Sequence, residues 1–195
     1  TFLPLNIFEP RYKKMLIDSF KKEKIICITL LKSEYEKNYE KNPEINLIGC
    51  IGRIEIKNDT PSGTYNILLS GLNKVRIHEI ESDKDYRLAE LEIIDEMYGD
   101  EDLNLLKQKV FRAFERMSID SEYPKIPDEF KELIDFEMAV NFLVSYLPID
   151  IIQKQKLLEL DDISLRAKIL VQFMDTSLGK FETGDISTLG DLRFN

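Results

Sequence analysis

The spacing of apolar and polar residues changes midway along the chain. Before residue 98, apolar residues gather in short runs rich in β-branched side chains, at 24–31, 47–56 and 86–94. Short runs of this kind, bounded by turn residues, predict strands. After residue 98, apolar residues recur every three or four positions, which predicts helices with one apolar face. We therefore expect an α+β fold in which the strands precede the helices.

The strands of the first half are expected to curve. Gly49 and Gly52 interrupt the second apolar run, and glycine within a strand marks a bulge or a tight bend. Simple alternation would still place Ile54 and Ile56 on the same face of that strand. The turn-forming residues at 58–63 then lead into another strand, so the two runs are expected to make a hairpin.

Two more strands are expected after this turn. The segment "TYNILLSG" alternates at Tyr65, Ile67 and Leu69, and the segment "KVRIHEI" alternates at Val75 and Ile77. Together with the runs on either side they bring the total to at least five strands. This number of short, curved strands predicts a small β-barrel.

The helices of the second half are expected to begin at proline or acidic residues. The first covers the periodic segment 103–117, and the second starts after Pro127 and reaches Leu147. Aspartate favours helix starts because its carboxylate accepts hydrogen bonds from the free N–H groups of the first turn. The aspartates expected to break or cap these helices are Asp135, Asp150 and Asp162. From Gly179 the chain is polar and glycine-spaced, which predicts a loosely ordered tail.

These patterns divide the chain into a strand-rich part at 1–97, a helical part at 98–178 and a tail at 179–195. Charge differs between the halves as well. Residues 1–97 carry 15 Lys+Arg and 17 Asp+Glu, a net charge of −2, whereas residues 98–195 carry 12 and 19, a net charge of −7. Proteins that bind nucleic acid concentrate positive charge, which neither half does. Nucleic acid is therefore not expected to be the main partner.

The cellular setting follows from the apolar stretches and the cysteines. No stretch reaches the roughly 18 apolar residues of a membrane span, and no basic leader precedes an apolar run at the start. We expect neither a membrane partner nor a secretory signal. Cys27 and Cys50 lie in strand-like apolar runs, so we expect reduced core thiols in a cytoplasmic protein. A single disulfide is the alternative if their strands are neighbours.

Candidate catalytic and metal-binding residues are few. His78 is the only histidine, and without a second histidine or a cysteine beside it a zinc site is not expected. The acidic clusters at 100–102 and 161–162 lie where helices are predicted to begin, so capping explains them better than metal binding does. The phosphate-binding pattern G-x-x-x-x-G-K-[ST] does not occur. We therefore expect a protein that is not an enzyme and needs no metal or cofactor.

A charged corner interrupts the apolar start of the chain. Pro10 suits the first turn of a helix, where its missing N–H costs nothing, and Glu9 lies beside the positive end of the helix dipole. Arg11 lies on the unfavourable side of the same dipole, so another contact must hold it. It is expected either to pair with Glu9 or a strand carboxylate, or to contact a partner.

Four segments resemble the Lon substrate-binding (Lon N-terminal) domain family, in the form of stand-alone bacterial Lon-domain proteins. They are "PLNIFEPRYKKML", "IGCIGRIEI", "GTYNILLSGLNKVRI" and "LPIDIIQKQKLLELDDISLRAKIL". The third carries a Gly-Leu-x-x-x-Arg-Ile signature of the family. The fourth resembles the helical pattern of the family at Pro148, Lys154, Gln155, Leu158, Glu159, Asp162 and Arg166. The similarity continues in order to about Met174.

This resemblance implies a PUA-like β-barrel, with a further strand before Thr1, followed by a helical bundle. It also implies a role in holding protein substrates, which in Lon proteases pass to ATPase and Ser-Lys peptidase modules. We expect neither module here, and therefore a non-catalytic module that binds unfolded or exposed polypeptide segments. Cooperation with an ATP-dependent protease is left open. The alternative function is RNA binding through the PUA-like barrel.

Five residues are hypothesised to contact a bound segment: Phe8, Glu9, Arg11, Tyr12 and Arg53. An apolar groove on the barrel, or between barrel and bundle, would accept hydrophobic side chains while polar groups fix the bound backbone. Each residue also has a structural explanation. Phe8 and Tyr12 suit a core, and Arg53 suits an ion pair on a strand.

Overall fold

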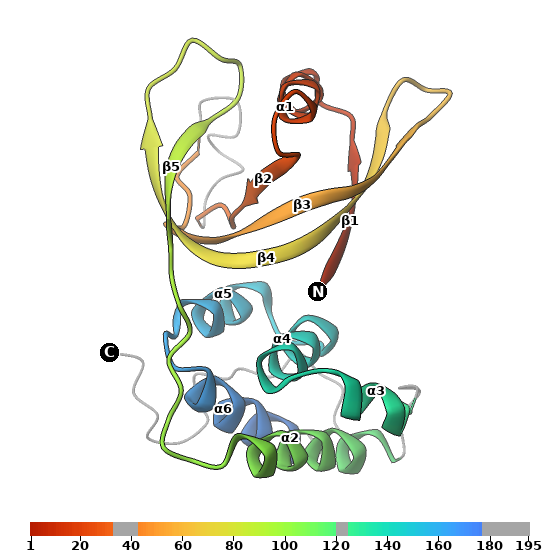
Figure 1. The fold of residues 1–195 in the computed structure, drawn as a ribbon, viewed down its shortest axis with the longest axis vertical. Helices are drawn as coiled ribbons and strands as arrows, with labels where there is room; N and C mark the ends of the chain where they lie inside the picture. Colours follow the sequence, from red (N-terminus) through yellow and green to blue (C-terminus); the bar gives the residue numbers. More distant parts are fainter. Residues whose placement is uncertain (33–42, 120–124, 177–195) are drawn as a thin grey trace. The chain divides into compact units, whose positions relative to one another are not determined.

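The computed structural model describes residues 1–32, 43–119 and 125–176, and the chain divides into two compact units, Thr1–Asp95 and Glu96–Asn195. The first unit contains the sheet and the second contains helices α2–α6 (Figure 1). The tail expected at 179–195 lies outside the described residues. Within the described ranges, no helix has both the length and the apolar content needed to cross a membrane.

An antiparallel sheet of five strands forms the first unit. Its elements, in chain order, are β1 (Phe2–Ile7), α1 (Pro10–Phe20), β2 (Ile25–Ile28), β3 (Ile48–Asp59), β4 (Tyr65–Ile80) and β5 (Leu88–Ile93). The strand order is β1-β4-β3-β2, and β5 also pairs with β4. The 16-residue strand β4 replaces the two separate strands expected there. It can do so because β1 and β5 share one of its edges, at opposite ends.

The sheet is open, so the expected closed barrel is wrong. Closure would need a ladder between β2 and β1 or β5, and none exists among the described residues. The expected curvature is present, since β3 and β4 bend along their length (Figure 1). β3 also has register shifts at Ile51/Gly52 and at Ile54/Ile56. Gly49 allows β2 to approach, because a Cβ at this position would lie 2.5 Å from the carbonyl oxygen of Ile28.

Helix α1 covers one face of the sheet (Figure 1). It begins at Pro10, as the corner predicts, and buries Leu16 completely. Leu16 packs in a cluster with strand residues that include Ile54 and Leu69. A second cluster on the sheet contains Ile45, Val75 and Ile77. We call the face that carries α1 the inner face and the opposite face the outer face.

The second unit contains five helices within its described residues. They are α2 (Leu103–Ser118), α3 (Asp128–Leu133), α4 (Phe136–Tyr146), α5 (Ile151–Glu159) and α6 (Ile163–Thr176). The expected break near Asp135 separates α3 from α4. The carboxylates at the helix starts accept backbone N–H hydrogen bonds, which confirms capping as their role; these residues are Asp102, Asp135, Asp150 and Asp162.

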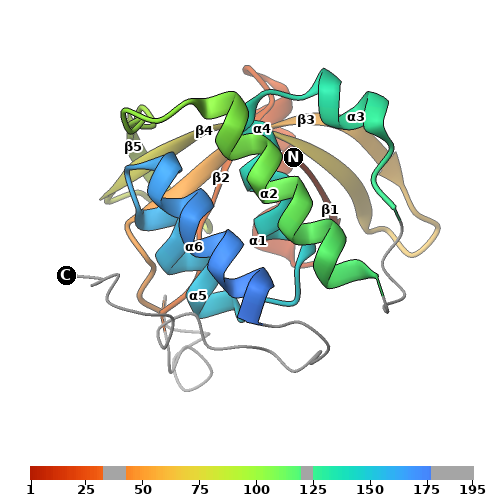
Figure 2. The same ribbon diagram turned by 90° about the horizontal axis from the view of Figure 1, so that it is seen from below.

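Helices α2 and α6 lie side by side and run in the same direction (Figure 2). Ion pairs join them near their starts, between Lys168 and Glu101, and near their ends, between Arg116 and Asp175. The segment before α2 is tied to the start of α6, since the N–H of Met97 donates to the carbonyl of Asp161. One continuous cluster of buried side chains from α2, α4, α5 and α6 forms the core of this unit.

Candidate functional site

The predicted corner residues lie where β1 passes into α1. Nε of Arg11 donates to Oε2 of Glu9 over 2.8 Å, and the Arg11 guanidinium lies 4.8 Å from the centroid of the Tyr12 ring. Tyr12 packs against the core cluster on the inner face. The ion pair expected for Arg11 is therefore present. Phe8, in contrast, leaves 62% of its surface exposed.

The strand registers define a second surface, on the outer face of the sheet. Residues directly opposite each other in antiparallel strands point to the same side. Since Leu3 and Ile54 are both paired with Leu69 of the inner-face core, the residues next to them in each strand lie on the outer face. Across β1, β4 and β3 they form three rows: Phe2–Ser70–Arg53, Pro4–Leu68–Ile56 and Asn6–Asn66–Asn58.

Two of these rows leave large apolar side chains exposed to solvent. Phe2 is 69% exposed and Ile56 is 49% exposed, while Pro4 is exposed and Leu68 is half-buried between them. Phe8 follows the last residue of β1 and is 62% exposed. Contiguous exposed apolar side chains of this kind make the outer face a candidate interaction surface.

A β-bulge brings Ile56 to this surface. Ile54 is paired with Leu69 and Ile56 with Leu68, so Glu55 is an extra residue in β3. One extra residue in a strand moves the side chains that follow it to the opposite face of the sheet. Ile54 is consequently buried, at 4% exposure, whereas Ile56 lies on the opposite face. The expectation that these two isoleucines share a face is wrong, because the glycine signals suggested a bulge without giving its position.

The row of asparagines, Asn6–Asn66–Asn58, forms one end of the outer-face surface. The side-chain amide of Asn6 donates to Oδ1 of Asn66 over 2.7 Å and to Oγ1 of Thr64 over 3.2 Å. These bonds tie the edge strand β1 to β4 by side chains as well as by the backbone ladder. The strands that carry the apolar rows are therefore held together by side-chain as well as backbone hydrogen bonds.

Arg53 lies at the other end of the surface, in the row of Phe2. Its side chain is exposed and takes part in no hydrogen bond or ion pair within residues 1–32, 43–119 and 125–176. The structure thus separates the predicted site residues. Arg53 belongs to the outer face and Phe8 follows the far end of β1, roughly 20 Å away at about 3.3 Å per residue, while Tyr12 belongs to the inner face.

No metal-binding cluster occurs among the described residues. No three His, Cys, Asp or Glu side chains within them are placed to hold a metal ion. His78 is exposed on β4, with Nε2 3.5 Å from Oε2 of Glu92. Cys27 and Cys50 do not form a disulfide with each other. Burial, and secondarily the charge of Cys50, raises the pKa of Cys27 to about 11, so its thiol is a weak nucleophile at neutral pH.

Comparison with known proteins gives the family of this chain. A family model described as the ATP-dependent protease La (LON) substrate-binding domain matches residues 1–176. The chain belongs to this family. The match includes the sheet, the corner and all the described helices.

Curated Lon proteases are similar to the chain over much of its length. That of Flavobacterium johnsoniae is 25% identical over 185 residues, which are 92% of this chain and 22% of the relative. That of Amoebophilus asiaticus is 30% identical over 136 residues, which are 67% of this chain and 16% of the relative. The chain therefore spans about a fifth of the length of the Lon proteases it matches.

Solved structures of Lon domains share the fold. The N-terminal domain of Mycobacterium avium complex Lon protease superposes with a TM-score of 0.70 at 16% identity, covering 90% of each chain. A Lon N-terminal domain protein from Xanthomonas campestris gives a TM-score of 0.63 at 21% identity, covering 88% of each. The open antiparallel sheet followed by helices is thus a Lon N-terminal domain fold.

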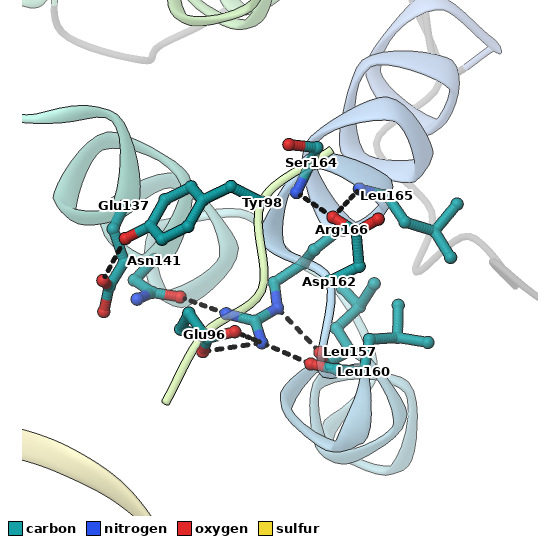
Figure 3. Close-up of polar contacts among 10 residues, drawn as sticks. All are labelled: Glu96, Tyr98, Glu137, Asn141, Leu157, Leu160, Asp162, Ser164, Leu165 and Arg166. Carbon is teal, nitrogen blue, oxygen red and sulfur yellow. Dashed lines mark hydrogen bonds and ion pairs between the residues drawn. The ribbon is translucent and has the colours of Figure 1, made fainter. Parts of the chain in front are cut away.

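In the helical part of this Lon domain, one arginine of the "LPIDIIQ…RAKIL" segment has a structural role (Figure 3). Arg166 is 1% exposed and donates to both carboxylate oxygens of Glu96, at 3.0 and 3.1 Å. It also donates to Oδ1 of Asn141 and to the carbonyl oxygens of Leu157 and Leu160. The side chain therefore joins α4, α5 and α6 to the segment before α2. Its burial and the hydrogen bonds from all three guanidinium nitrogens assign it to the core of the unit.

A polar pocket of about 390 Å³ lies between α1 and the loop that joins β4 to β5. Asp18 of α1 accepts hydrogen bonds from Lys21, from Lys84 and from the hydroxyl of Tyr86. These three donors, in that order of effect, hold the pKa of the Asp18 carboxyl well below its usual range. The contacts fasten α1 to the loop, which gives the pocket a structural purpose.

Proposed function

We propose that this chain is a non-catalytic module that binds exposed segments of other polypeptides. The observation that carries this proposal is the exposed apolar outer face, with Phe2, Pro4 and Ile56, on a domain of the LON substrate-binding family. An apolar side chain exposed on a rigid sheet can be covered by a partner at little entropic cost. Membership of a family described as substrate-binding supplies the class of partner.

A bound segment would lie across the rows in an extended form. Its apolar side chains would cover Phe2 and Ile56, and a carboxylate of the segment would pair with Arg53, which lacks a partner among the described residues. Phe8, which is exposed, would contact the bound segment beyond the row Asn6–Asn66–Asn58. Backbone groups of the segment would hydrogen-bond to the amides of Asn6 and its neighbours.

The other corner residues would fix the shape of the turn between β1 and α1 without contacting the bound segment. Glu9 and Arg11 hold each other at 2.8 Å, and Tyr12 anchors the start of α1 to the core. Together they fix the turn that exposes Phe8. In this proposal they shape the surface without contributing to the chemistry of binding, and no residue alters the bound segment. An ATP-dependent protease is the partner that would act on a polypeptide held in this way.

Peptide arrays of unfolded protein segments, followed by fluorescence anisotropy of the best binders, test this function. We expect binding to favour apolar and aromatic segments and to depend weakly on salt. The double substitution Phe2→Ser with Ile56→Ser should weaken binding at least tenfold, because each residue would lose most of its buried contact area. Leu133→Ser, at an 84% exposed position on α3, is the matched control and should leave binding unchanged.

Other outcomes would replace this function. Equal binding by the outer-face variant and the Leu133 control would remove the outer face from the site. Tighter binding of single-stranded RNA that falls steeply with salt would favour the RNA-binding alternative. Reproducible cleavage of casein by the pure protein, abolished by changing a single Ser or His, would contradict a non-catalytic role.

A further inference from the structure

Arg53 is the only charged residue in the three rows of the outer face. Its side chain is exposed and forms neither a hydrogen bond nor an ion pair within the part of the chain that the structure describes. Glu55, two residues further along β3, is also exposed and does not pair with it. The N–H donors of the Arg53 guanidinium are therefore available to a partner.

Apolar side chains flank Arg53 in its row. Arg53 is paired with Ile25 of β2 on one side and with Ser70 of β4 on the other. Ser70 is in turn paired with Phe2 of β1. Since opposed residues point to the same face, the row extends from Phe2 to Ile25 with the guanidinium between them. A partner that covers these apolar groups also displaces water from the guanidinium, which strengthens its hydrogen bonds to a carboxylate.

We propose that the outer face selects segments in which an acidic residue lies two positions from an apolar residue, and that Arg53 determines this specificity. The inference rests on the proposed function, because it concerns the same surface. The partner it specifies is an extended stretch of polypeptide. Its carboxylate pairs with Arg53, and its apolar side chain packs on Leu68 and Ile56.

The two-residue spacing follows from the register of β4. Ser70, Leu68 and Asn66 lie in successive rows, two residues apart, which is about 6.6 Å at 3.3 Å per residue. Side chains on one face of an extended segment recur at the same interval. A segment lying along β4 can thus place a carboxylate in the row of Arg53 and an apolar side chain in the row of Ile56. A spacing of one or three residues would turn one of these side chains away from the sheet.

The charge of the whole chain favours the opposite preference. Its formal net charge is −9, with 36 Asp+Glu against 27 Lys+Arg. A field of this sign attracts basic segments and repels acidic ones. A preference for acidic segments would therefore have to arise locally, from Arg53 within the outer face.

Fluorescence anisotropy of labelled peptides tests this specificity. The peptides share one composition and carry a single Glu one, two or three residues from a Phe, in either order. We expect the two-residue spacing to bind most tightly. Replacing its Glu by Gln should weaken binding about fivefold, the upper end for an exposed ion pair. This difference should shrink in high salt, which screens exposed charges.

Arg53→Glu is the decisive variant, and Arg112→Glu makes the same change of charge at an exposed position on α2 as its control. Arg53→Glu should reverse the preference, so that a peptide with Lys in place of Glu binds more tightly. Arg112→Glu should keep the wild-type order. Circular dichroism checks that both variants are folded. Arg53→Gln should abolish the difference between the Glu and Gln peptides, and it supplies the same test if the charge reversal disturbs folding.

The outcomes separate this specificity from the proposed function. Suppose that Phe2→Ser with Ile56→Ser weakens binding but Arg53→Glu keeps the preference of the wild type. The specificity is then overturned while the proposed function stands. Equal affinity at all three spacings, or a reversal in Arg112→Glu as well, would also overturn it. If no peptide binds at the outer face, the proposed function fails and this inference fails with it.

Discussion

Arg166 and Glu96 form a buried ion pair across 70 residues of sequence, with Nη2 of Arg166 3.0 Å from Oε1 of Glu96. Their side chains are 1% and 8% exposed. Such a pair is stable only because the guanidinium makes further hydrogen bonds, here to Asn141, Leu157 and Leu160. The pair therefore specifies how the segment before α2 docks on the other helices of its unit.

Replacing Arg166 with methionine should destabilise the protein by about 3–5 kcal/mol, because the Glu96 carboxylate would stay buried without its partner. Urea unfolding, followed by circular dichroism, measures the change. Arg116→Met is the matched control. Its ion pair with Asp175 is nearly half exposed, so we expect a loss of about 0–1 kcal/mol. Similar losses for the two variants would contradict the structural role of Arg166.

The register shift in β3 predicts opposite behaviour for two neighbouring isoleucines. Ile54→Ala should cost about 2–5 kcal/mol, because it opens a cavity in the inner-face core. Ile56→Ala should cost under about 1 kcal/mol, because its side chain is half exposed on the outer face. The same urea experiment compares them. Equal losses would mean that both side chains are buried and that the bulge at Glu55 is absent.

Local signals in the sequence were sufficient where a residue acts on its own neighbourhood. Pro10 begins α1, and Asp102 and Asp162 cap their helices. Each feature depends on backbone groups within four residues. The buried pair of Arg166 with Glu96 could not be found in this way, because nothing local identifies a partner 70 positions away.

The candidate surface was only partly predictable, for the same physical reason. Phe8 and Arg53 could be proposed from residue type, but Phe2, Pro4 and Ile56 join them only through the pairing of β1 and β3 with β4. A one-residue shift in that pairing moves a side chain to the other face. Barrel closure also depends on whether distant edge strands meet. Curvature signals in single strands do not determine that.

The lowered pKa of Asp18 predicts a pH dependence of stability. Hydrogen bonds from Lys21, Lys84 and Tyr86 favour the charged carboxylate, so its folded-state pKa lies below the ordinary value of 3.8. The stabilisation is complete above that ordinary value and is lost as the pH falls below about 4, through the folded-state pKa. Asp18→Asn should therefore lower the free energy of unfolding at pH 7 and have progressively less effect below pH 4.

Urea unfolding of both proteins between pH 7 and pH 3 measures this difference. Asp83→Asn removes a carboxylate of the same pocket that has no ion pair among the described residues, and it serves as the control. This substitution removes a negative charge of the pocket and leaves the three hydrogen-bond donors of Asp18 in place. A constant difference between wild type and Asp18→Asn would show that the charged network does not contribute to folding.

The raised pKa of Cys27 predicts slow alkylation in the native protein. Only the thiolate reacts with iodoacetamide, and a pKa raised from 9.0 to about 11 lowers the thiolate fraction at pH 8 about a hundredfold. Mass spectrometry of peptides distinguishes Cys27 from Cys50 in one sample. In urea, where burial is lost, the modification rate of Cys27 should rise by at least this factor. A native rate equal to the unfolded rate would mean that the thiol is exposed, which is incompatible with β2 packing against the sheet core as described.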